Sequence, residues 1–283
     1  MNFMYQLIQT LLPVSWLEPA FMKNAFLAIL VACPLFGVLG TVVVANRMAF
    51  FSDAIGHSAL TGIALGMIAG VHEPTLAMVL FSLVLGCAII LVKRNGSASA
   101  DTVIGVFSAT AVALGIVLLS SGGSFSKYQR YLVGDILSIQ PAEIALLLGA
   151  FLLTVVVWIF FFNHMLLATL HTAVAHSRGI KTGALELLFA LLVAGIVTVS
   201  IRWTGLLVIN SLLVLPAATS RALSKNTARY IGGAVVISLV SGIAGLVFSY
   251  YSGAATGASI VLMNAVIFLF AFVYSFLQKS IIH

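Results

Sequence analysis

Long runs without a charged residue constrain this chain more than any other feature. Thr102–Phe125, Ile144–Asn163 and Ile231–Gln278 contain no Asp, Glu, Lys or Arg. A helix of about 20 apolar residues crosses the hydrocarbon core of a bilayer, so runs of this length predict membrane spans. Charged residues make up only 7% of the chain, against about 25% in an average soluble domain. The composition therefore excludes a cytosolic enzyme, a nucleic-acid-binding domain and a disulfide-stapled secreted module.

Apolar segments separated by charged or turn-forming stretches predict nine helices and an all-α fold. The segments are residues 25–45, 54–70, 75–92, 102–121, 141–162, 184–201, 205–220, 228–250 and 257–277. The second and seventh have about 16–17 residues, which is short against the about 20 expected for a full crossing. Pro216 lies within the seventh, where it removes a backbone donor and is expected to bend or break the helix. The prediction is a polytopic membrane protein with eight or nine transmembrane helices, forming a single domain over residues 1–283.

The cations divide unevenly between the two sides of a nine-span arrangement. Alternating connections place Lys23, Lys127, Arg130 and Arg202 on one side, and Arg47, Lys93, Arg94, Arg178, Lys181, Arg221, Lys225, Arg229 and Lys279 on the other. Because cytoplasmic loops carry an excess of Lys and Arg, the side with the larger set is predicted to be cytoplasmic. The N-terminus, with a short segment of residues 1–23, then lies outside and the C-terminus inside. The net charge of +6 is therefore attributed to the cations that orient the chain in the membrane, and not to a nucleic-acid-binding surface.

One of the predicted spans carries an acidic residue and a histidine near its start. Asp53 and His57 are four residues apart, so on a helix they lie on one face. An ionisable side chain inside a span costs at least a few kcal/mol, so it is by default a candidate functional site. Imidazole with carboxylate suits first-row divalent metals such as zinc, manganese or iron. Asp53 and His57 are therefore the candidate metal ligands.

The opposite face of the same segment carries small residues. Ser58, Gly62, Gly66 and Gly70 recur every four positions, and such ridges let membrane helices approach closely. We expect this ridge to pack against a neighbouring helix. A simpler interpretation of the polar pair stays open: the carboxylate interacts with the helix dipole and the histidine hydrogen-bonds beside it. Two side chains are also too few for a tight metal site, but a two-fold dimer would supply four.

The connection between the fifth and sixth spans, about residues 164–181, is predicted to be cytoplasmic. Its apolar side chains recur at helix-like intervals, and Gly179 is a plausible C-terminal stop for a helix. One interpretation is an amphipathic helix that rests on the membrane surface. The other is a docking helix for a cytosolic partner.

Motifs of the common membrane chemistries are absent from the sequence. There is no G-x-x-x-x-G-K-[ST] phosphate loop, no H-E-x-x-H and no G-x-S-x-G. Cys33 and Cys87 lie in apolar runs and form no C-x-x-C pair, so a disulfide or thiolate site is not expected. The chain is therefore not expected to be an enzyme or to hydrolyse ATP through that loop.

Four segments resemble the permease subunits of bacterial zinc, manganese and iron ABC importers, the ABC-3 family. The most specific are RMAFFSDAIGHSALTGIALG at Arg47–Gly66 and LLVINSLLVLPAATSR at Leu206–Arg221. YLVGDIL at Tyr131–Leu137 and TGASIVL at Thr256–Leu262 are similar to two further family segments. Together they cover nearly the whole chain.

The resemblance implies a homodimeric permease in the bacterial inner membrane that moves a divalent metal into the cytoplasm. It also implies two cytosolic ATPase subunits, which would use the ATP, and an extracytoplasmic metal-binding receptor. No permanently bound cofactor and no nucleic-acid partner are implied. Asp53 and His57 match the family's acidic and histidine positions on the pathway helix. The ATPase subunits would dock near Leu170 to Gly179, where the family places its coupling helix.

This chain departs from the family pattern in two places, the coupling segment and the outer turn before the last motif. The coupling segment of the family usually carries acidic residues, whereas here Thr172, Val174 and His176 occupy that neighbourhood. The family commonly has Asp-x-Pro before the last motif, whereas this chain has Gly253-Ala-Ala255. Composition alone also leaves open a secondary metal carrier driven by an ion gradient, and a membrane metalloenzyme is a third, less favoured class.

Overall fold

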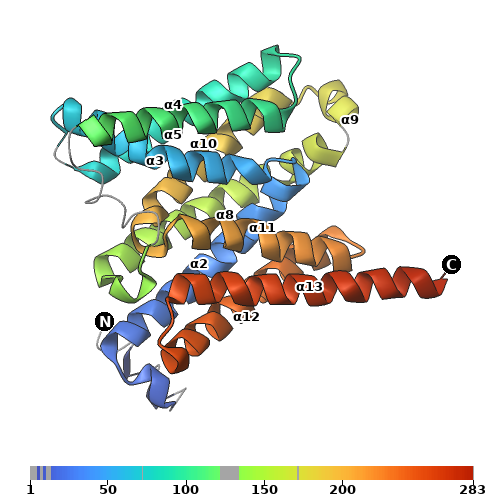
Figure 1. The fold of residues 1–283 in the computed structure, drawn as a ribbon. Coiled ribbons are helices and arrows are strands. Elements are labelled where there is room, and N and C mark those ends of the chain that lie inside the picture. The colour runs from blue at the N-terminus through green and yellow to red at the C-terminus, as the bar shows by residue number, and fades with distance from the viewer. Residues whose placement is uncertain are drawn as a thin grey trace. The chain divides into compact units, whose positions relative to one another are not determined.

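The computed structural model of the chain describes residues 5–6, 9–10, 14–71, 73–121, 134–170 and 172–282. Throughout these described residues the regular elements are helices, which confirms the all-α prediction. The long helices are α2 (Ala20–Ala45), α3 (Ala49–Ile68), α4 (Pro74–Asn95), α5 (Ala100–Ser121), α8 (Pro141–Leu170), α10 (Thr182–Thr204), α11 (Leu206–Leu223), α12 (Thr227–Ser252) and α13 (Thr256–Ile282). Short helical turns are η1 (Ser15–Leu17), η2 (Ile136–Ser138) and α9 (Thr172–Ser177). Each predicted segment coincides with one long helix (Figure 1).

Seven of the described helices are long and apolar enough to cross a membrane: α2, α4, α5, α8, α10, α12 and α13. The two remaining long helices, α3 and α11, come from the two segments that the sequence marks as short. The predicted total of eight or nine spans is therefore not confirmed by these helices alone. α3 is 20 residues long but carries Asp53, His57 and several small polar residues, which lower its hydropathy. α11 continues past Pro216 to Leu223, so the helix bears the proline without being broken.

The chain divides into two compact units. One consists of residues 1–44, 133–151 and 203–283 and contains most of α2 together with α11, α12 and α13. In it α11, α12 and α13 pack against one another. Gly40 of α2 allows a very close approach, because a Cβ atom there would lie 1.9 Å from the Leu213 carbonyl oxygen of α11. The hydroxyl of Tyr230 donates to the carbonyl of Thr41 at 3.0 Å and ties α12 to α2.

The other unit consists of residues 45–132 and 152–202 and contains α3, α4, α5, most of α8, α9 and α10. In this unit α3 packs against both α4 and α5, as Figure 1 also shows. A Cβ atom on Gly62 would lie 2.9 Å from Cα of Met78, and one on Gly66 would lie 2.3 Å from Cβ of Ala77. Both contacts are to α4, so the expected packing of the small-residue ridge is confirmed at these two positions. This unit positions the candidate site.

Gly70 was expected to continue the ridge, and this expectation is wrong. The helix ends at Ile68, and Gly70 follows with a φ of +73° and no atom within 4 Å of a Cβ built on it. A left-handed glycine just after the last helical turn is a common way to end a helix. The four-residue spacing is therefore a packing signal at Gly62 and Gly66 and a termination signal at Gly70.

The packing of α3 on α4 predicts different effects of two glycine substitutions on the stability of the protein. Gly62→Ala should destabilise the protein by about 1–3 kcal/mol, because backbone atoms of α4 cannot move aside for the added methyl group. Gly105→Ala in α5 is the matched control, since nothing lies within 4 Å of its added Cβ, and it should be neutral or slightly stabilising. The thermal unfolding temperature of the purified variants in detergent measures both. Equal unfolding temperatures would contradict the close approach.

Candidate functional site

α3 begins directly after a tight turn that follows α2. Arg47 in this turn has a φ of 57°, in the left-handed region that non-glycine residues seldom adopt. The turn closes with the Phe51 amide donating to the carbonyl of Met48 at 2.9 Å. The Ser52 hydroxyl donates to the Ala49 carbonyl at 3.3 Å in the first helical turn. Asp53 therefore lies one turn into the helix, on a backbone that is already regular.

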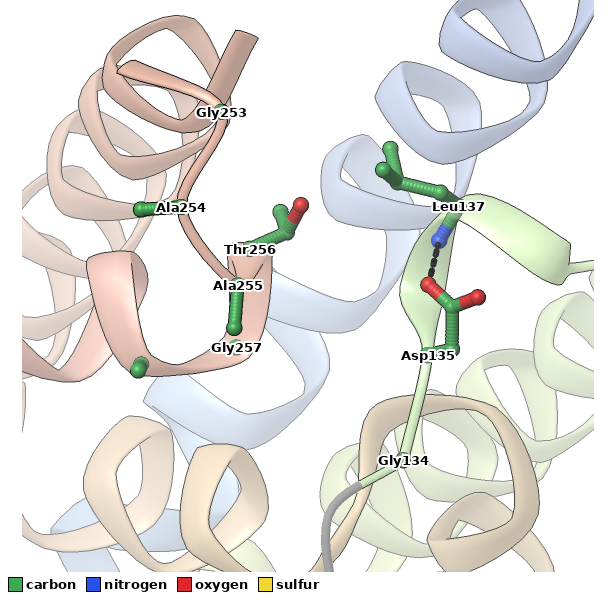
Figure 2. Close-up of a pocket in the computed structure, with 9 residues that line it drawn as sticks. Gly134, Asp135, Leu137, Gly253, Ala254, Ala255, Thr256 and Gly257 are labelled. Atoms are coloured by element: carbon green, nitrogen blue, oxygen red, sulfur yellow. Dashed lines mark hydrogen bonds between the residues drawn. The ribbon is translucent and has the colours of Figure 1, made fainter. Parts of the chain in front are cut away.

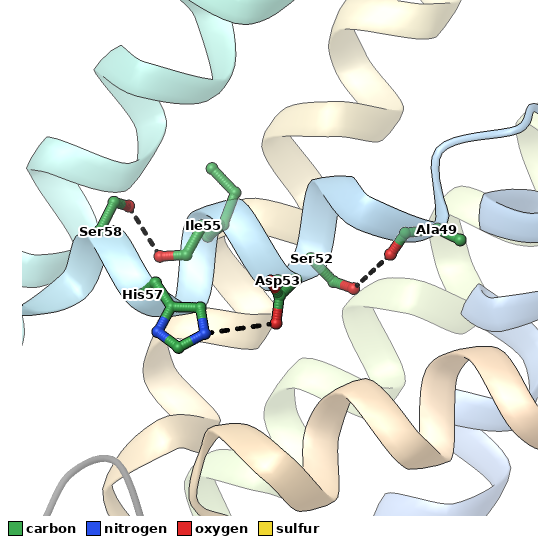
Figure 3. Close-up of polar contacts among 6 residues, drawn as sticks. All are labelled: Ala49, Ser52, Asp53, Ile55, His57 and Ser58. Carbon is green, nitrogen blue, oxygen red and sulfur yellow. Dashed lines mark hydrogen bonds and ion pairs between the residues drawn. The ribbon is translucent and has the colours of Figure 1, made fainter. Parts of the chain in front are cut away.

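Asp53 and His57 contact each other on one face of α3. Their closest atoms, Oδ1 of Asp53 and Nε2 of His57, are 3.5 Å apart (Figure 3). The side chain of His57 is 40% exposed and that of Asp53 is 44% exposed. The prediction that both lie on the same face is confirmed, whereas their role as metal ligands stays a prediction. A carboxylate beside an imidazole offers one oxygen donor and one nitrogen donor to a divalent transition metal.

Most of α3 around the polar pair is buried. Ser58 is completely buried and donates to the carbonyl of Ile55 at 2.7 Å. The hydroxyl of Thr61 donates to the carbonyl of Ala111 in α5, and Gly115 of α5 leaves the room for that threonine. Leu60, one helical repeat beyond Asp53 on the same face, is also buried. Polar side chains are thus presented only by the first half of this face.

The described residues contain no group of three or more His, Cys, Asp and Glu side chains that could hold a metal ion. Asp53 and His57 therefore offer two donors, whereas a tetrahedral zinc site needs four. Within the part of the chain that the structure describes, the pair could bind a metal only weakly, or together with donors from another molecule.

A second polar feature, which the sequence did not reveal, joins α4 to α10. Nζ of Lys93 lies 2.5 Å from Oε1 of Glu186, and both side chains are about three-quarters buried, being 22% and 26% exposed. Next to this pair, the guanidinium of Arg94 lies over Gly183, where a Cβ atom would be 2.4 Å from Cζ. Residues 93 and 186 are far apart in the sequence and share no local pattern, so nothing in the sequence pointed to their contact.

The segment predicted to dock a partner is helical over most of its described residues. α8 continues to Leu170, eight residues beyond the predicted end of its span, and no proline or glycine interrupts it after Gly149. α9 covers Thr172–Ser177. His171 between the two helices lies outside the described residues. The predicted stop is confirmed, since Gly179 has a φ of +73° and its amide donates to the carbonyl of His176 at 3.0 Å.

The last residues of α8 contact the turn that precedes α3. Oγ1 of Thr169 hydrogen-bonds to Oδ1 of Asn46 at 3.2 Å and to the carbonyl of Met165 at 2.8 Å. Asn46 directly precedes Arg47 in the α2–α3 turn. One side-chain contact thus connects the region just before α9 with the start of the helix that carries Asp53.

Two of the family-like segments line one pocket of about 310 Å³. Gly134, Asp135 and Leu137 form one wall, and Gly253 with the first residues of α13 forms the other (Figure 2). Tyr131–Val133, the start of the first of these segments, lies outside the described residues. The Asp135 carboxylate accepts the Leu137 amide at 3.1 Å, so this aspartate caps η2. Gly253 has a φ of +66° and ends α12.

These features define a polytopic α-helical membrane protein with an acid–imidazole pair on α3, a long helix that is not among its seven candidate spans. Residues 18–275 match the ABC 3 transport family, and the chain belongs to that family. The match covers α2 to α12 completely, α3 and its polar pair included, and α13 as far as residue 275.

The chain is similar to two named relatives and to one solved structure over most of their length. The chain is 30% identical over 254 residues to the high-affinity zinc uptake system membrane protein ZnuB of Haemophilus influenzae, covering 89% of this chain and 95% of that one. It is 29% identical over 252 residues to the manganese import system permease protein ScaB of Streptococcus gordonii, covering 89% and 90%. The solved structure of PsaBC from Streptococcus pneumoniae in complex with Fab superposes with a TM-score of 0.78 at 25% identity, covering 96% and 95%.

The exposure of the polar pair predicts how cysteines would react along α3. In a variant whose Cys33 and Cys87 are replaced by alanine, His57→Cys should react with a charged, water-soluble thiol reagent, because its side chain is accessible. Ser58→Cys, the matched control one position along, should not react, since Ser58 is fully buried. Labelling followed by mass spectrometry measures both. If His57→Cys reacted only with a lipid-soluble reagent, the site would face acyl chains and not water.

Proposed function

We propose that this chain is the membrane permease subunit of an ATP-driven importer that carries a divalent transition metal ion, zinc, manganese or iron, into the cytoplasm. The observation that carries the proposal is the half-exposed pair of Asp53 and His57 on a packed helix, in a protein of which only 7% of the residues are charged. An ionisable pair in such a helix is costly unless it serves a polar pathway. The names of the zinc and manganese relatives support a metal as the cargo.

The pathway is proposed to lie between two copies of the chain. A two-fold axis next to α3 would bring two carboxylates and two imidazoles together, and this is enough for transient four-coordinate binding. Loose coordination favours transport, because a carrier must release the ion that it binds. In this arrangement the side chains of Asp53 and His57, which are 44% and 40% exposed in a single chain, would line the water-accessible pathway.

We propose nine membrane crossings, with α3 and α11 as the two that fall below the apolarity and length of the rest. Both would be sheltered by neighbouring helices, since α3 packs between α4 and α5, and α11 packs with α12 and α13. An odd number of crossings puts the N-terminal residues 1–23 outside and the C-terminus in the cytoplasm, as the cation distribution favours. Residues 1–283 would then form one permease domain, and residues 164–181 would face the cytoplasm.

Two kinds of partner follow from this function. Cytosolic ATPase subunits would dock near residues 170–179 and use the ATP, because the chain has no phosphate loop of its own. An extracytoplasmic receptor would deliver the metal. The metal is then a substrate in transit, and no resident cofactor is needed.

Force from the ATPase is proposed to reach α3 through the contact between α8 and the α2–α3 turn. α9 follows α8 almost immediately, and Thr169 at the end of α8 is hydrogen-bonded to Asn46. A displacement of α9 would pull on this turn and tilt α3, which would change how Asp53 and His57 face the pathway. This gives alternating access a physical route through α9, the end of α8 and one side-chain contact.

Removal of either member of the pair should abolish most metal uptake. Asp53→Ala and His57→Ala, each reconstituted in vesicles with the ATPase subunits, should take up zinc or manganese at least about tenfold more slowly, because even an outer-shell partner of a metal ligand is commonly worth about 10–100-fold. The measurement is the initial rate of uptake with ATP inside or outside the vesicle as the orientation requires.

Asp101→Ala is the control for loss of a carboxylate, since Asp101 is exposed in the first turn of α5 and lies on a different helix. Its uptake rate should match that of the native chain. Near-native uptake by both Asp53→Ala and His57→Ala would refute the pathway assignment. Uptake by the native chain without any ATPase subunit would instead favour the carrier driven by an ion gradient.

The contact between Thr169 and Asn46 predicts a variant that separates ATP hydrolysis from transport. Thr169→Val keeps the size of the side chain but removes the hydroxyl, so the amount of metal moved per ATP hydrolysed should fall a few-fold, in line with about 1 kcal/mol for one hydrogen bond. Thr169→Ser, which retains the hydroxyl, should keep the native ratio. The ratio is measured from parallel uptake and phosphate-release assays. A native ratio in Thr169→Val would show that force takes another route.

A further inference from the structure

Next to α9 the surface of its unit is hollowed by a basic pocket of about 720 Å³. The C-terminal end of α4, the end of α9 and the first turn of α10 form its walls. The charged and titratable side chains that line it are those of Arg94, His176, Lys181 and Glu186. This basic hollow lies outside the Asp53 and His57 site and plays no part in holding the metal.

The positive charge of the hollow is not neutralised by the described part of the chain. Glu186 is the only acid among the lining residues, and it is already paired with Lys93 at 2.5 Å. The ion pairs recorded among the described residues are this one and the pair of Asp53 with His57, so Arg94 and Lys181 have no acidic partner there. Arg178, which is exposed just before the hollow, adds a further cation.

The side chain of Arg94 is exposed, and its guanidinium lies against the start of α10. Its guanidinium lies where the Cβ of any larger residue at position 183 would lie, directly over the start of α10. The N-terminal end of a helix carries partial positive charge, and the first turn of α10 contains no acidic residue that would offset it. A guanidinium, a lysine next to it and a helix N-terminus therefore converge on one space. Such an arrangement is favourable when an anion occupies the space.

We propose that the basic hollow receives a carboxylate side chain of the cytosolic ATPase subunit, so that the end of α4 shares the docking surface with α9. This inference rests on the proposed function, which puts the hollow on the cytoplasmic side. It assigns to Arg94 and Lys181 the recognition of an acidic residue on the partner. In this contact the permease supplies the basic side chains and the ATPase the acidic one, whereas the family's coupling segment usually supplies acidic residues.

The shape of the hollow favours a protein side chain over a lipid phosphate. Its lining includes Ile180 and Leu187, which suit the apolar stem of a glutamate better than a compact phosphate. Its outer wall is α9, which follows α8. α8 has 30 residues, so it is about 45 Å long against a hydrocarbon core of about 30 Å, and its end can extend into water. An arginine beside a lysine binds a carboxylate well, because the guanidinium can donate two parallel hydrogen bonds.

Binding of the purified cognate ATPase to the full-length chain in nanodiscs tests the proposal. Arg94→Glu combined with Lys181→Glu should weaken binding at low salt by at least about tenfold, since each reversal replaces attraction by repulsion. Lys225→Glu is the matched control, because Lys225 is an exposed cation of the α11–α12 turn that does not line the hollow, and its affinity should change less than about threefold. Unchanged binding by the double variant would overturn the proposal.

Gly183→Ala provides a second variant that alters no charge. Its added methyl group would displace the guanidinium of Arg94, so ATPase binding should weaken in the same direction, with the thermal unfolding temperature of the chain close to native. Native affinity in this variant would show that the position of Arg94 is irrelevant and would count against the proposal.

Nanodiscs of neutral phosphatidylcholine and of anionic phosphatidylglycerol separate the protein partner from a lipid. The loss of affinity in the double variant should appear in both. A loss that appears only with the anionic lipid would assign the hollow to lipid headgroups and overturn the docking proposal. Binding is measured without metal, so failure of the docking proposal can be distinguished from failure of the proposed transport function. Native ATPase binding without any zinc or manganese uptake would refute the proposed function alone.

Discussion

The close approach of α3 and α4 is the contact on which the candidate site depends. Two glycines let the helices meet at distances that exclude any side chain, with 2.9 Å from a Cβ on Gly62 to Cα of Met78. On another side, Thr61 hydrogen-bonds to the backbone of α5. A helix fixed on two sides cannot rotate to bury its remaining polar face. Asp53 and His57 are therefore kept half exposed by the packing, and the cost of exposing them is met by the contacts on the opposite face.

The helical segments and the shared face of the polar pair could be predicted because both depend on local periodicity. The same reasoning failed where one residue type can serve two purposes. Gly70 continues the spacing of Gly62 and Gly66 but ends the helix, and only its φ of +73° distinguishes the two roles. Long-range contacts were out of reach as well. Nothing in the local sequence joins Lys93 to Glu186 or Thr169 to Asn46, because these contacts form only when α4 meets α10 and α8 meets the α2–α3 turn.

The number of spans shows how function disturbs the signal used for prediction. A membrane helix is recognised by its length and apolarity, and α3 loses apolarity because it carries the polar pair. The helix that carries the proposed metal ligands is thus among the hardest to recognise as a span. α11 falls short for a different reason, since it has only 18 residues and contains Pro216. A helix of this kind can still cross when it is covered by others, because its backbone is then shielded from lipid.

The cations on the side proposed to be cytoplasmic can serve two purposes with different structural demands. Orientation in the membrane depends on how many Lys and Arg a loop carries and hardly on where each one points. Arg94 satisfies that demand from any position near the end of α4, and its guanidinium lies over Gly183 at the start of α10, where it lines the same hollow as Lys181. Orientation alone does not require these charges to converge on one hollow. An acidic group of the partner would neutralise them, and α9, which is followed by the left-handed Gly179 at the same hollow, would connect that group to the helices of the proposed metal pathway.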